Sequence, residues 1–464
     1  MAREFDVVVV GAGPAGEVVA GRLADRGGKQ VAIVERDLVG GECSFYACMP
    51  SKALLRPAEL LNEVARVPGA AEAVTGKLDV SAVLARRDEV VNKLSDDQQL
   101  PWLRDRGIEL FRGAGRLDGP NRVIVGDQVL TARDAVVIAT GTTAVIPPIP
   151  GLREAHAWSN REITTAQSVP ERLVVLGGGV VGVEMAQAWS SLGSSVTVIE
   201  ALDRLLAREE PFVGAEVQKS LTAAGVRILI GMKASAVKRE RDEVTVTLEN
   251  GETVTGDVLL VAIGRRPLTD DLGLESVGLD PGGYIKVDDH LQVEGVSNLY
   301  AIGDANGRSL LTHSGKYQSR IAADHILGAA AATARQDGPG APRVMFTDPQ
   351  IAAVGITLEA AQQQGIEVVA IDLPTGDTPG GSFIGRGASG TSRFVVDAKR
   401  QILLGVTFVG PEVAEFLQAA TVAVVAEVPL KTLAHAIAPF PTRLELWLKF
   451  LEAYEAHTGV SLHS

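Results

Sequence analysis

The stretch VVVVGAGPAG, residues 7–16, decides the fold of the amino-terminal part of the chain. Four consecutive valines bounded by glycines are typical of a short strand that is buried in a parallel sheet. The residues up to about Arg26 predict a helix, and Val31–Val34 predict a second strand that ends at Glu35. Strand, glycine turn, helix and strand, in this order, predict a dinucleotide-binding unit.

The same order returns in the middle of the chain. Leu173–Leu176 predict a strand, residues 177–182 repeat the glycine turn, and Val183–Leu192 predict a helix. A further strand, Val196–Ile199, ends at Glu200. The distance between the two units is too long for a solenoid repeat, so the sequence predicts two related nucleotide folds.

The glycines of each turn have separate tasks. One makes the tight turn, one lets the backbone approach the phosphates, and one lets the helix pack on the strand. In chain order these are Gly11, Gly13 and Gly16 in the first unit, and Gly177, Gly179 and Gly182 in the second. The helix N-terminus attracts the pyrophosphate, and Glu35 and Glu200 are placed to accept hydrogen bonds from a ribose. Two glycine-rich loops without a ligand are the weaker alternative.

Length and composition limit the class of protein. A chain of 464 residues predicts about three domains, and its 46% hydrophobic and 22% charged residues are ordinary for a globular protein. The net charge of −13 argues against nucleic acid or an anionic membrane as the main partner. No apolar run approaches the roughly 18–20 residues of a membrane span, and the N-terminus does not resemble a signal peptide. We therefore expect a cytoplasmic protein.

The two cysteines lie in the stretch GGECSFYACMPSK, residues 40–52. Cys43 and Cys48 come within reach of each other if the first turn of a helix is adjusted, and a helix N-terminus is expected to lower a thiol pKa from about 8.5. Two buried apolar thiols are one alternative, and half of a zinc site is another. Zinc is disfavoured because none of the seven histidines lies near the cysteines in sequence. The spacing therefore favours a redox-active pair.

Other short strands run into conspicuous turns. Ala135–Ala139 precede Thr140 and Gly141, Leu259–Ile263 precede Gly264, and Leu299–Ile302 precede Asp304. The proline-rich residues 146–151 predict a boundary, and Ala329–Arg343 have the composition of a linker. After the linker an α+β domain is expected, with strands near Val368–Ile371, Arg393–Val396 and Ile402–Val409 and helices from about Pro411 and Arg443.

Across its length the chain resembles the flavin-dependent pyridine nucleotide–disulfide oxidoreductases, which include dihydrolipoamide dehydrogenase, glutathione reductase and mercuric reductase. The resemblance is carried by the two glycine turns, the cysteine stretch, and the segments ATG at 139–141, AIGRRP at 262–267, YAIGD at 300–304 and FTDP at 346–349. It implies an α/β fold with two Rossmann-like domains, for FAD and NAD, and a C-terminal α+β domain that forms a homodimer. The expected bounds are 1–148 and 269–338 for FAD, 149–268 for the nicotinamide cofactor and 339–464 for dimerisation.

The resemblance also implies the roles of single residues. Cys48 corresponds to the thiol next to the flavin and Cys43 to the thiol that meets the acceptor, while Lys52 lies near the flavin and pairs with Glu184. The implied FAD site consists of Gly11, Gly13, Gly16, Glu35, Gly41, Lys52, Gly115, Thr140, Gly141 and Asp304. The implied nicotinamide site consists of Gly177, Gly179, Gly182, Glu200 and Gly264. Glu200 would repel a 2′-phosphate, and no basic residue follows before Arg204, so NADH is expected rather than NADPH.

The chain departs from the family in one place. Disulfide reductases of this kind carry a His-Pro-Thr-x-x-Glu segment, whose histidine moves protons to the thiol that meets the acceptor. The corresponding residues 440–445 of this chain end with Glu445, but they begin with Phe440 in place of the histidine. A general base typically raises the rate of a reaction by about 10²–10⁴-fold, so its absence argues against ordinary turnover of a lipoamide- or glutathione-like disulfide. His435 or Tyr46 is a weak substitute, and a mercuric reductase would need a second cysteine pair.

Three functions follow from this departure. In the first, NADH reduces the Cys43–Cys48 disulfide through FAD, and the thiols then reduce a disulfide or a related small acceptor. In the second, electrons pass directly from the flavin to a quinone, a dye or a second nicotinamide. In the third, the protein is a non-catalytic redox sensor.

Overall fold

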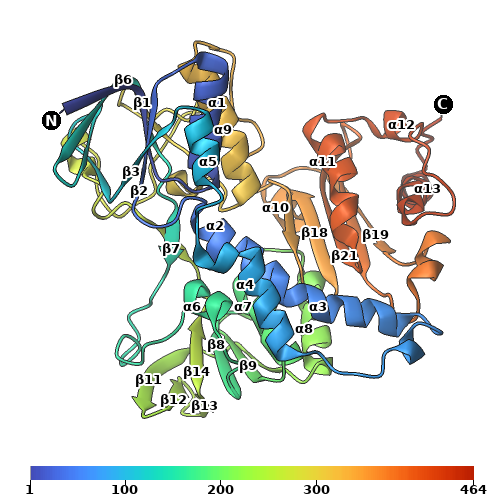
Figure 1. The fold of residues 1–464 in the computed structure, drawn as a ribbon. Coiled ribbons are helices and arrows are strands. Elements are labelled where there is room, and N and C mark those ends of the chain that lie inside the picture. The colour runs from blue at the N-terminus through green and yellow to red at the C-terminus, as the bar shows by residue number, and fades with distance from the viewer. Residues whose placement is uncertain (1, 464) are drawn as a thin grey trace. The chain divides into compact units, whose positions relative to one another are not determined.

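The computed structural model describes residues 2–463, which form two compact units (Figure 1). The first unit runs to Pro50 and adds Ala85–Val145 and Gly264–Pro339. The second unit contains Ser51–Leu84, Ile146–Ile263 and Gly340 onward. Each unit is therefore built from segments that are far apart in sequence, and the four domain bounds given above stay a prediction.

The first unit is built on a seven-stranded sheet in the order β3-β2-β1-β6-β5-β4, with β16 also paired to β6. Its strands are β1 (Ala2–Val10), β2 (Val31–Glu35), β3 (Glu109–Arg112), β4 (Gly115–Leu117), β5 (Arg122–Val125), β6 (Gln128–Ile138) and β16 (Leu299–Ala301). Val7–Val10 lie parallel to Val31–Val34 on one side and to residues 135–138 on the other. All four valines are buried, as the apolar run predicts.

Helices lie between or after the strands of this unit. They are α1 (Pro14–Gly27), the short α2 (Gly41–Phe45), α5 (Leu100–Asp105) and α9 (Thr312–Ile326). The α3 helix (Cys48–Arg66) begins in this unit, and α4 (Val80–Val90) ends in it. A two-stranded ribbon joins β7 (Thr142–Ala144) and β15 (Arg265–Pro267).

The second unit contains a four-stranded parallel sheet in the order β10-β9-β8-β14. Its strands are β8 (Arg172–Leu176), β9 (Ser195–Glu200), β10 (Arg227–Ile230) and β14 (Val258–Val261), with helices α6 (Asn160–Thr165), α7 (Val180–Ser191) and α8 (Pro211–Ala223). An antiparallel sheet is added by β11 (Ala234–Glu240), β12 (Glu243–Leu248) and β13 (Thr253–Gly256). The β14 strand ends at Val261, two residues earlier than predicted, and Ile263 is exposed.

The end of the chain forms a five-stranded antiparallel sheet in the order β17-β18-β21-β20-β19. Its strands are β17 (Arg343–Met345), β18 (Gln350–Gly355), β19 (Val368–Pro374), β20 (Thr391–Asp397) and β21 (Ile402–Gly410). The helices are α10 (Leu358–Gln363), α11 (Leu417–Val425), α12 (Leu430–Leu433) and α13 (Leu446–Thr458).

Two helix starts were predicted too early in this α+β region. The α11 helix begins at Leu417 rather than near Pro411, because Glu412 has a φ of 51° and Val413–Phe416 form a 3₁₀ turn. The α13 helix begins at Leu446, after a 3₁₀ turn at Arg443–Glu445. Left-handed and 3₁₀ residues of this kind leave no clear mark in the hydrophobic pattern. Among residues 2–463, no helix is both long enough and apolar enough to cross a bilayer.

Candidate dinucleotide and thiol sites

The glycine turn of the first unit is tight at its ends and open in its middle. Gly11 has a φ of 106°, and a Cβ there would lie 2.3 Å from the carbonyl oxygen of Ala139. A Cβ on Gly16 would lie 1.9 Å from the carbonyl oxygen of Gly11. Around Gly13, at the N-cap of α1, no atom lies within 4 Å of such a Cβ. The open position at a helix N-terminus therefore fits a pyrophosphate.

The glycine turn of the second unit repeats this geometry. Gly177 has a φ of 107°, and its Cβ would lie 2.5 Å from the carbonyl oxygen of Ala262. A Cβ on Gly182 would lie 1.9 Å from the carbonyl oxygen of Gly177, whereas the space around Gly179, the N-cap of α7, is open. The exposed side chains of Val180 and Ile263 lie next in sequence to Gly179 and Gly264. Both units thus have the same cradle for phosphates.

The acid at the end of each second strand also anchors the turn. Glu35 accepts hydrogen bonds from the backbone N–H groups of Ala12 and Asp37, each over 2.7 Å. Glu200 accepts the equivalent pair, from the turn residue Gly178 and from the residue two positions beyond the acid, over 2.5 and 2.7 Å. Each carboxylate has lone pairs left for a ribose hydroxyl. The sequence indicated the ribose role but not the anchoring role.

The other predicted glycines lie near the turns. Gly41 has a φ of 61°, and a Cβ there would lie 2.7 Å from the Cα of Gly13, so the start of α2 lies against the first glycine turn. Gly115 begins β4, where a Cβ would lie 2.9 Å from a methyl group of Val10. Gly264 has a φ of 146° with open space around it.

Polar atoms suited to a hydroxyl-rich ligand follow the carboxyl end of β6. The Thr140 hydroxyl is buried, and within residues 2–463 it has no hydrogen-bond partner. Asp304 accepts a hydrogen bond of 2.6 Å from the Thr142 hydroxyl, and burial raises the pKa of Asp304. An orphaned buried hydroxyl and a buried acid are costly unless a ligand completes their hydrogen bonds. These residues therefore fit the polar part of a dinucleotide.

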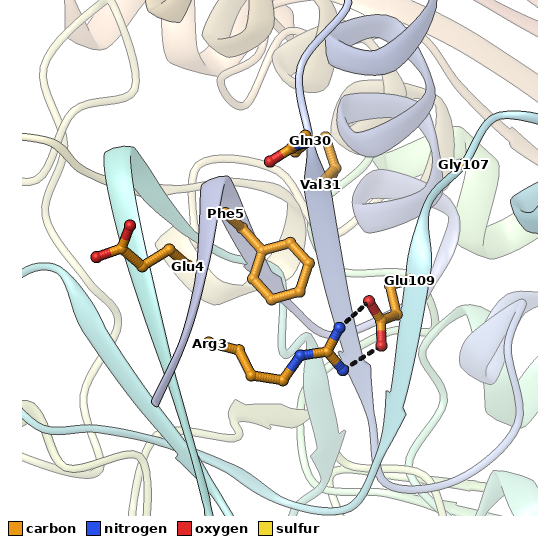
Figure 2. A pocket seen from close by; sticks show the side chains of 7 residues that line it. All are labelled: Arg3, Glu4, Phe5, Gln30, Val31, Gly107 and Glu109. Carbon is orange, nitrogen blue, oxygen red and sulfur yellow. Dashed lines mark hydrogen bonds and ion pairs between the residues drawn. The ribbon is translucent and has the colours of Figure 1, made fainter. Parts of the chain in front are cut away.

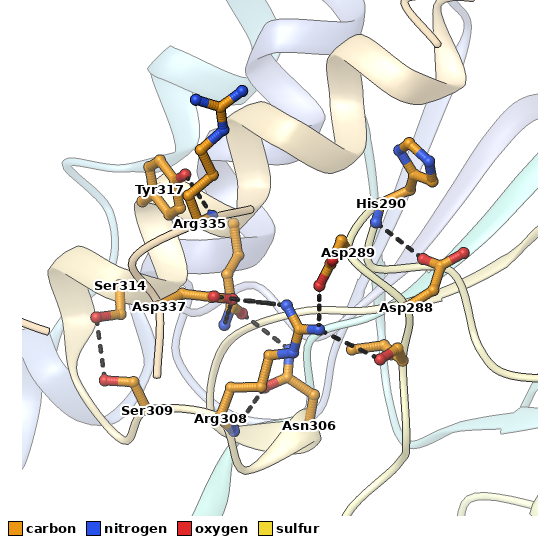
Figure 3. Close-up of polar contacts among 12 residues, drawn as sticks. Asp288, Asp289, His290, Asn306, Arg308, Ser309, Ser314, Tyr317, Arg335 and Asp337 are labelled. Carbon is orange, nitrogen blue, oxygen red and sulfur yellow. Dashed lines mark hydrogen bonds and ion pairs between the residues drawn. The ribbon is translucent and has the colours of Figure 1, made fainter. Parts of the chain in front are cut away.

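A buried network supports the turn that carries Asp304. The amide oxygen of Gln318, on α9, accepts from the backbone of Gly303 over 2.6 Å, and its amide nitrogen donates to Asp337 over 2.9 Å. Asp337 in turn pairs with Arg308 over 3.3 Å (Figure 3). The network ties a residue of the linker-like segment to the Asp304 turn.

The two cysteines lie together, in two helices rather than one. Cys43 belongs to α2, Tyr46 interrupts the helix with a φ of −132°, and Cys48 is the first residue of α3. Both are thiols, and Cys43 is hydrogen-bonded to Cys48. The Cys48 sulfur lies 3.6 Å from the hydroxyl of Thr312, the first residue of α9. The predicted approach of the two sulfurs is therefore present.

The expectation of a lowered thiol pKa is wrong for Cys43. Its hydrogen bond to Cys48 raises the pKa of the Cys43 thiol, and burial and the charge of Cys48 raise it further. Two thiols in contact hold one shared proton strongly, because a second negative charge would lie beside the first. Thr312 and Lys316 act in the opposite direction and lower the Cys43 pKa. In contact with Cys48, the Cys43 thiol is therefore harder to ionise than a free thiol.

Arg265 links the cysteine helix to the ribbon at Thr142, and sequence reasoning did not assign it a role. Its guanidinium donates to the Thr142 hydroxyl over 2.7 Å and to the Thr142 carbonyl oxygen over 2.8 Å. It also pairs over 3.1 Å with Glu42, the residue before Cys43. The motif AIGRRP contained this arginine, but only the contacts reveal that it positions the start of the thiol segment.

Lys52 and Glu184 form the predicted pair in the second unit. The Lys52 ammonium lies 2.7 Å from the Glu184 carboxylate, whose side chain is 4% exposed. Glu184 also accepts from the backbone N–H of Phe346 over 2.9 Å, and the Lys52 ammonium lies 5.0 Å from the centre of the Phe346 ring. The FTDP motif therefore holds the acid through its backbone.

Residues 440–445 combine an exposed ring with partly buried polar groups. Phe440 is 74% exposed, whereas one oxygen of the Glu445 carboxylate is buried with no hydrogen-bond partner among the described residues. His435 packs its ring against His463, with 5.8 Å between the ring centres.

Two other features of the described residues do not form a candidate site. A pocket lined by Arg3, Phe5, Val31 and Glu109, among others, lies at the amino ends of β1–β3, and the Arg3–Glu109 ion pair crosses it (Figure 2). Ligands of such sheets bind at the opposite, carboxyl ends of the strands. Within residues 2–463 no group of three or more His, Cys, Asp or Glu side chains is arranged to hold a metal ion.

Comparison with known families decides the assignment. Residues 5–325 match the model of the pyridine nucleotide-disulphide oxidoreductases, and residues 341–449 match the dimerisation domain of the same proteins. The chain belongs to this family. Members of this oxidoreductase family are enzymes that depend on FAD and use NAD(P)H, and the dimerisation domain implies a homodimer.

Relatives cover the whole chain. A dihydrolipoyl dehydrogenase of Thermus scotoductus is 34% identical over 470 residues, covering 99% of both chains. A mercuric reductase of Staphylococcus aureus is 30% identical over 448 residues, covering 95% of this chain and 81% of the relative. The flavoprotein disulfide reductase RclA of Escherichia coli, solved as a Cu(II) complex, has a TM-score of 0.85 at 26% identity over 97% of this chain and 99% of its own. LpdA of Mycobacterium tuberculosis has a TM-score of 0.84 at 27% identity, covering 96% and 98%.

Proposed function

We propose that the chain is an NADH-dependent flavoprotein disulfide reductase that acts through Cys43 and Cys48. The observation that carries this proposal is the contact between the two thiols, in the same unit as the Gly11–Gly16 cradle. We also propose that it works as a cytoplasmic homodimer.

The residues of the chain divide the work as follows. The first cradle, with Glu35, Thr140 and Asp304, would hold FAD, which would supply two-electron redox chemistry between the nicotinamide and the sulfur pair. The second cradle, with Glu200, holds the nicotinamide. Reduction breaks the Cys43–Cys48 bond with two electrons and two protons, one carried with the nicotinamide hydride and one from solvent. Lys52, fixed by Glu184, is the cation to which the family resemblance assigns a role with the flavin.

The acceptor is a disulfide or a related small molecule that the reduced Cys43 attacks. The experiment is a panel of disulfides, quinones and dyes offered to the purified protein with NADH, followed by the loss of NADH absorbance. Turnover of at least one disulfide at a rate of about 1 s⁻¹ or more supports the proposal. Turnover of quinones and dyes alone contradicts it.

A second candidate function is favoured by the exposed Phe440. Because phenylalanine carries no proton, a route from the flavin directly to a quinone, a dye or a second nicotinamide needs nothing that the chain lacks. In this case, the Cys43→Ala, Cys48→Ala double variant keeps quinone and dye reduction. If the double variant loses both completely, the direct route is wrong.

NADH is expected to be used with at least about tenfold higher kcat/KM than NADPH, because the buried Glu200 carboxylate repels a 2′-phosphate. Leu202, which is 56% exposed two residues beyond Glu200, is the position for a matched change. Leu202→Arg is expected to raise kcat/KM for NADPH, and Leu202→Gln is its uncharged control. Equal use of both cofactors by the unaltered protein contradicts this assignment.

Gly16→Ala and Gly182→Ala are expected to separate the two cofactor sites. Each added Cβ would lie 1.9 Å from a carbonyl oxygen of its own turn, so each variant disrupts one cradle. Gly16→Ala should be isolated with little or no flavin colour. Gly182→Ala should be yellow and reducible by dithionite, with reduction by NADH slowed by at least about tenfold. The reverse pattern would exchange the two assignments.

A further inference from the structure

The α9 helix places a polar side chain beside the thiol pair. Its first residue, Thr312, lies with its hydroxyl 3.6 Å from the Cys48 sulfur. The helix is fixed against α1, because Ser319 donates to the Ala15 carbonyl oxygen over 2.8 Å and a Cβ on Gly315 would lie 3.3 Å from the Ala15 Cβ. The start of α9 therefore has little freedom to move relative to the sulfurs.

Lys316 follows Thr312 by one helical turn and lies on the same face of α9, since residues four apart are neighbours on a helix surface. Its backbone is next to Gly315, where α9 touches α1, and its side chain is exposed at the surface. A lysine carries its ammonium on a flexible four-carbon stem, and on a helix such a side chain leans toward the preceding turn, which here begins at Thr312, the residue that contacts Cys48.

The effect of the Lys316 charge on nearby ionisable groups agrees with a position of Lys316 near the thiols. The Lys316 charge lowers the pKa of Cys43 and also lowers the pKa of Glu17, in the first turn of α1. The charged groups that act on Cys43 are Cys48, which raises its pKa, and Lys316, which lowers it. Burial raises the pKa of Glu17 to about 7, so above neutral pH Glu17 is ionised and offsets part of the Lys316 charge.

We propose that Lys316 is a positioning residue that stabilises the Cys43 thiolate by charge, in the place of the histidine that Phe440 replaces. This inference rests on the proposed function and names the group that activates its nucleophile. The ionised Cys43 attacks one sulfur of the acceptor, the acceptor S–S bond breaks, and the departing half leaves with the electron pair and takes a proton from solvent.

The test measures the pH at which Cys43 becomes reactive, in a Cys48→Ser background where Cys43 titrates alone. Alkylation of Cys43 by iodoacetamide is followed by mass spectrometry from about pH 6 to 11. Lys316→Met is expected to raise the midpoint by about 0.5 to 1 pH unit, and Lys316→Arg is expected to restore it. Glu17→Gln is expected to shift the midpoint in the opposite direction, which a partly unfolded variant would not do.

Arg320→Met, one turn farther along α9, is the matched control and is expected to leave the midpoint unchanged. A midpoint that is the same in Lys316→Met and in the parent overturns the inference. So does a shift that Lys316→Arg does not reverse. A failure of the proposed function gives a different result. If that function is wrong, NADH leaves the Cys43–Cys48 disulfide of the unaltered protein oxidised, and this outcome does not depend on the alkylation midpoint.

Discussion

Cys43→Ser is expected to lower kcat/KM for the reduction of a disulfide acceptor by at least about 10³-fold, because the hydroxyl cannot form the mixed disulfide through which exchange proceeds. The same variant should still be reduced by NADH and pass electrons to a small dye, because both cofactor cradles are untouched. The measurement is steady-state turnover with one disulfide and one dye on the same preparation.

The neighbouring change Ser44→Ala, on the same short α2 helix, is the control and should leave both activities within about threefold. Cys43→Ser protein that still reduces the disulfide at a parental rate would show that the electrons do not travel through this thiol. Equal loss of the dye and disulfide activities would instead point to damage to the flavin site.

Lys52→Met is expected to destabilise the second unit by about 3 kcal/mol, because it leaves the buried Glu184 carboxylate without its ion-pair partner. The estimate is at the low end of the range for such pairs, since the Lys52 side chain is 33% exposed and water reaches it. Thermal unfolding with equal flavin occupancy measures the effect. The double variant Lys52→Met, Glu184→Gln should recover most of the loss, because the unpaired charge is removed.

Arg56→Met is the matched control, one turn farther along α3. Arg56 pairs with Glu59 and Glu63 at the surface, where its side chain is 50% exposed, so its loss should cost less than about 1 kcal/mol. A Lys52→Met protein as stable as the Arg56→Met protein would mean that water already screens the Glu184 charge.

Local pattern was enough to predict much of the fold. The valine run, the two glycine turns and the acids at Glu35 and Glu200 predicted both parallel strand pairs within a few residues, because each depends on residues that are close in sequence. The two late helices of the C-terminal region were placed too early, since the left-handed residue at Glu412 and the 3₁₀ turns before both helices are not marked by the hydrophobic pattern.

The site was less predictable where it depends on contacts between distant segments. Thr312 and Lys316 come from a helix more than 250 residues after the cysteines, and nothing in their own sequence marks them as neighbours of a thiol. Arg265 lay inside a recognised motif, yet its contacts with Glu42 and Thr142 appear only in three dimensions. The raised pKa of Cys43 has the same origin, because the contact with Cys48 outweighs any helix effect.

The proposed function requires that the sulfur atoms of Cys43 and Cys48 accept electrons from the bound flavin. Anaerobic titration with dithionite, read by absorbance, measures this directly. We predict an uptake of about four electrons per flavin, two for the flavin and two for the Cys43–Cys48 pair, with a long-wavelength absorption band after the first two. An uptake of only two electrons, with no such band, would contradict the account.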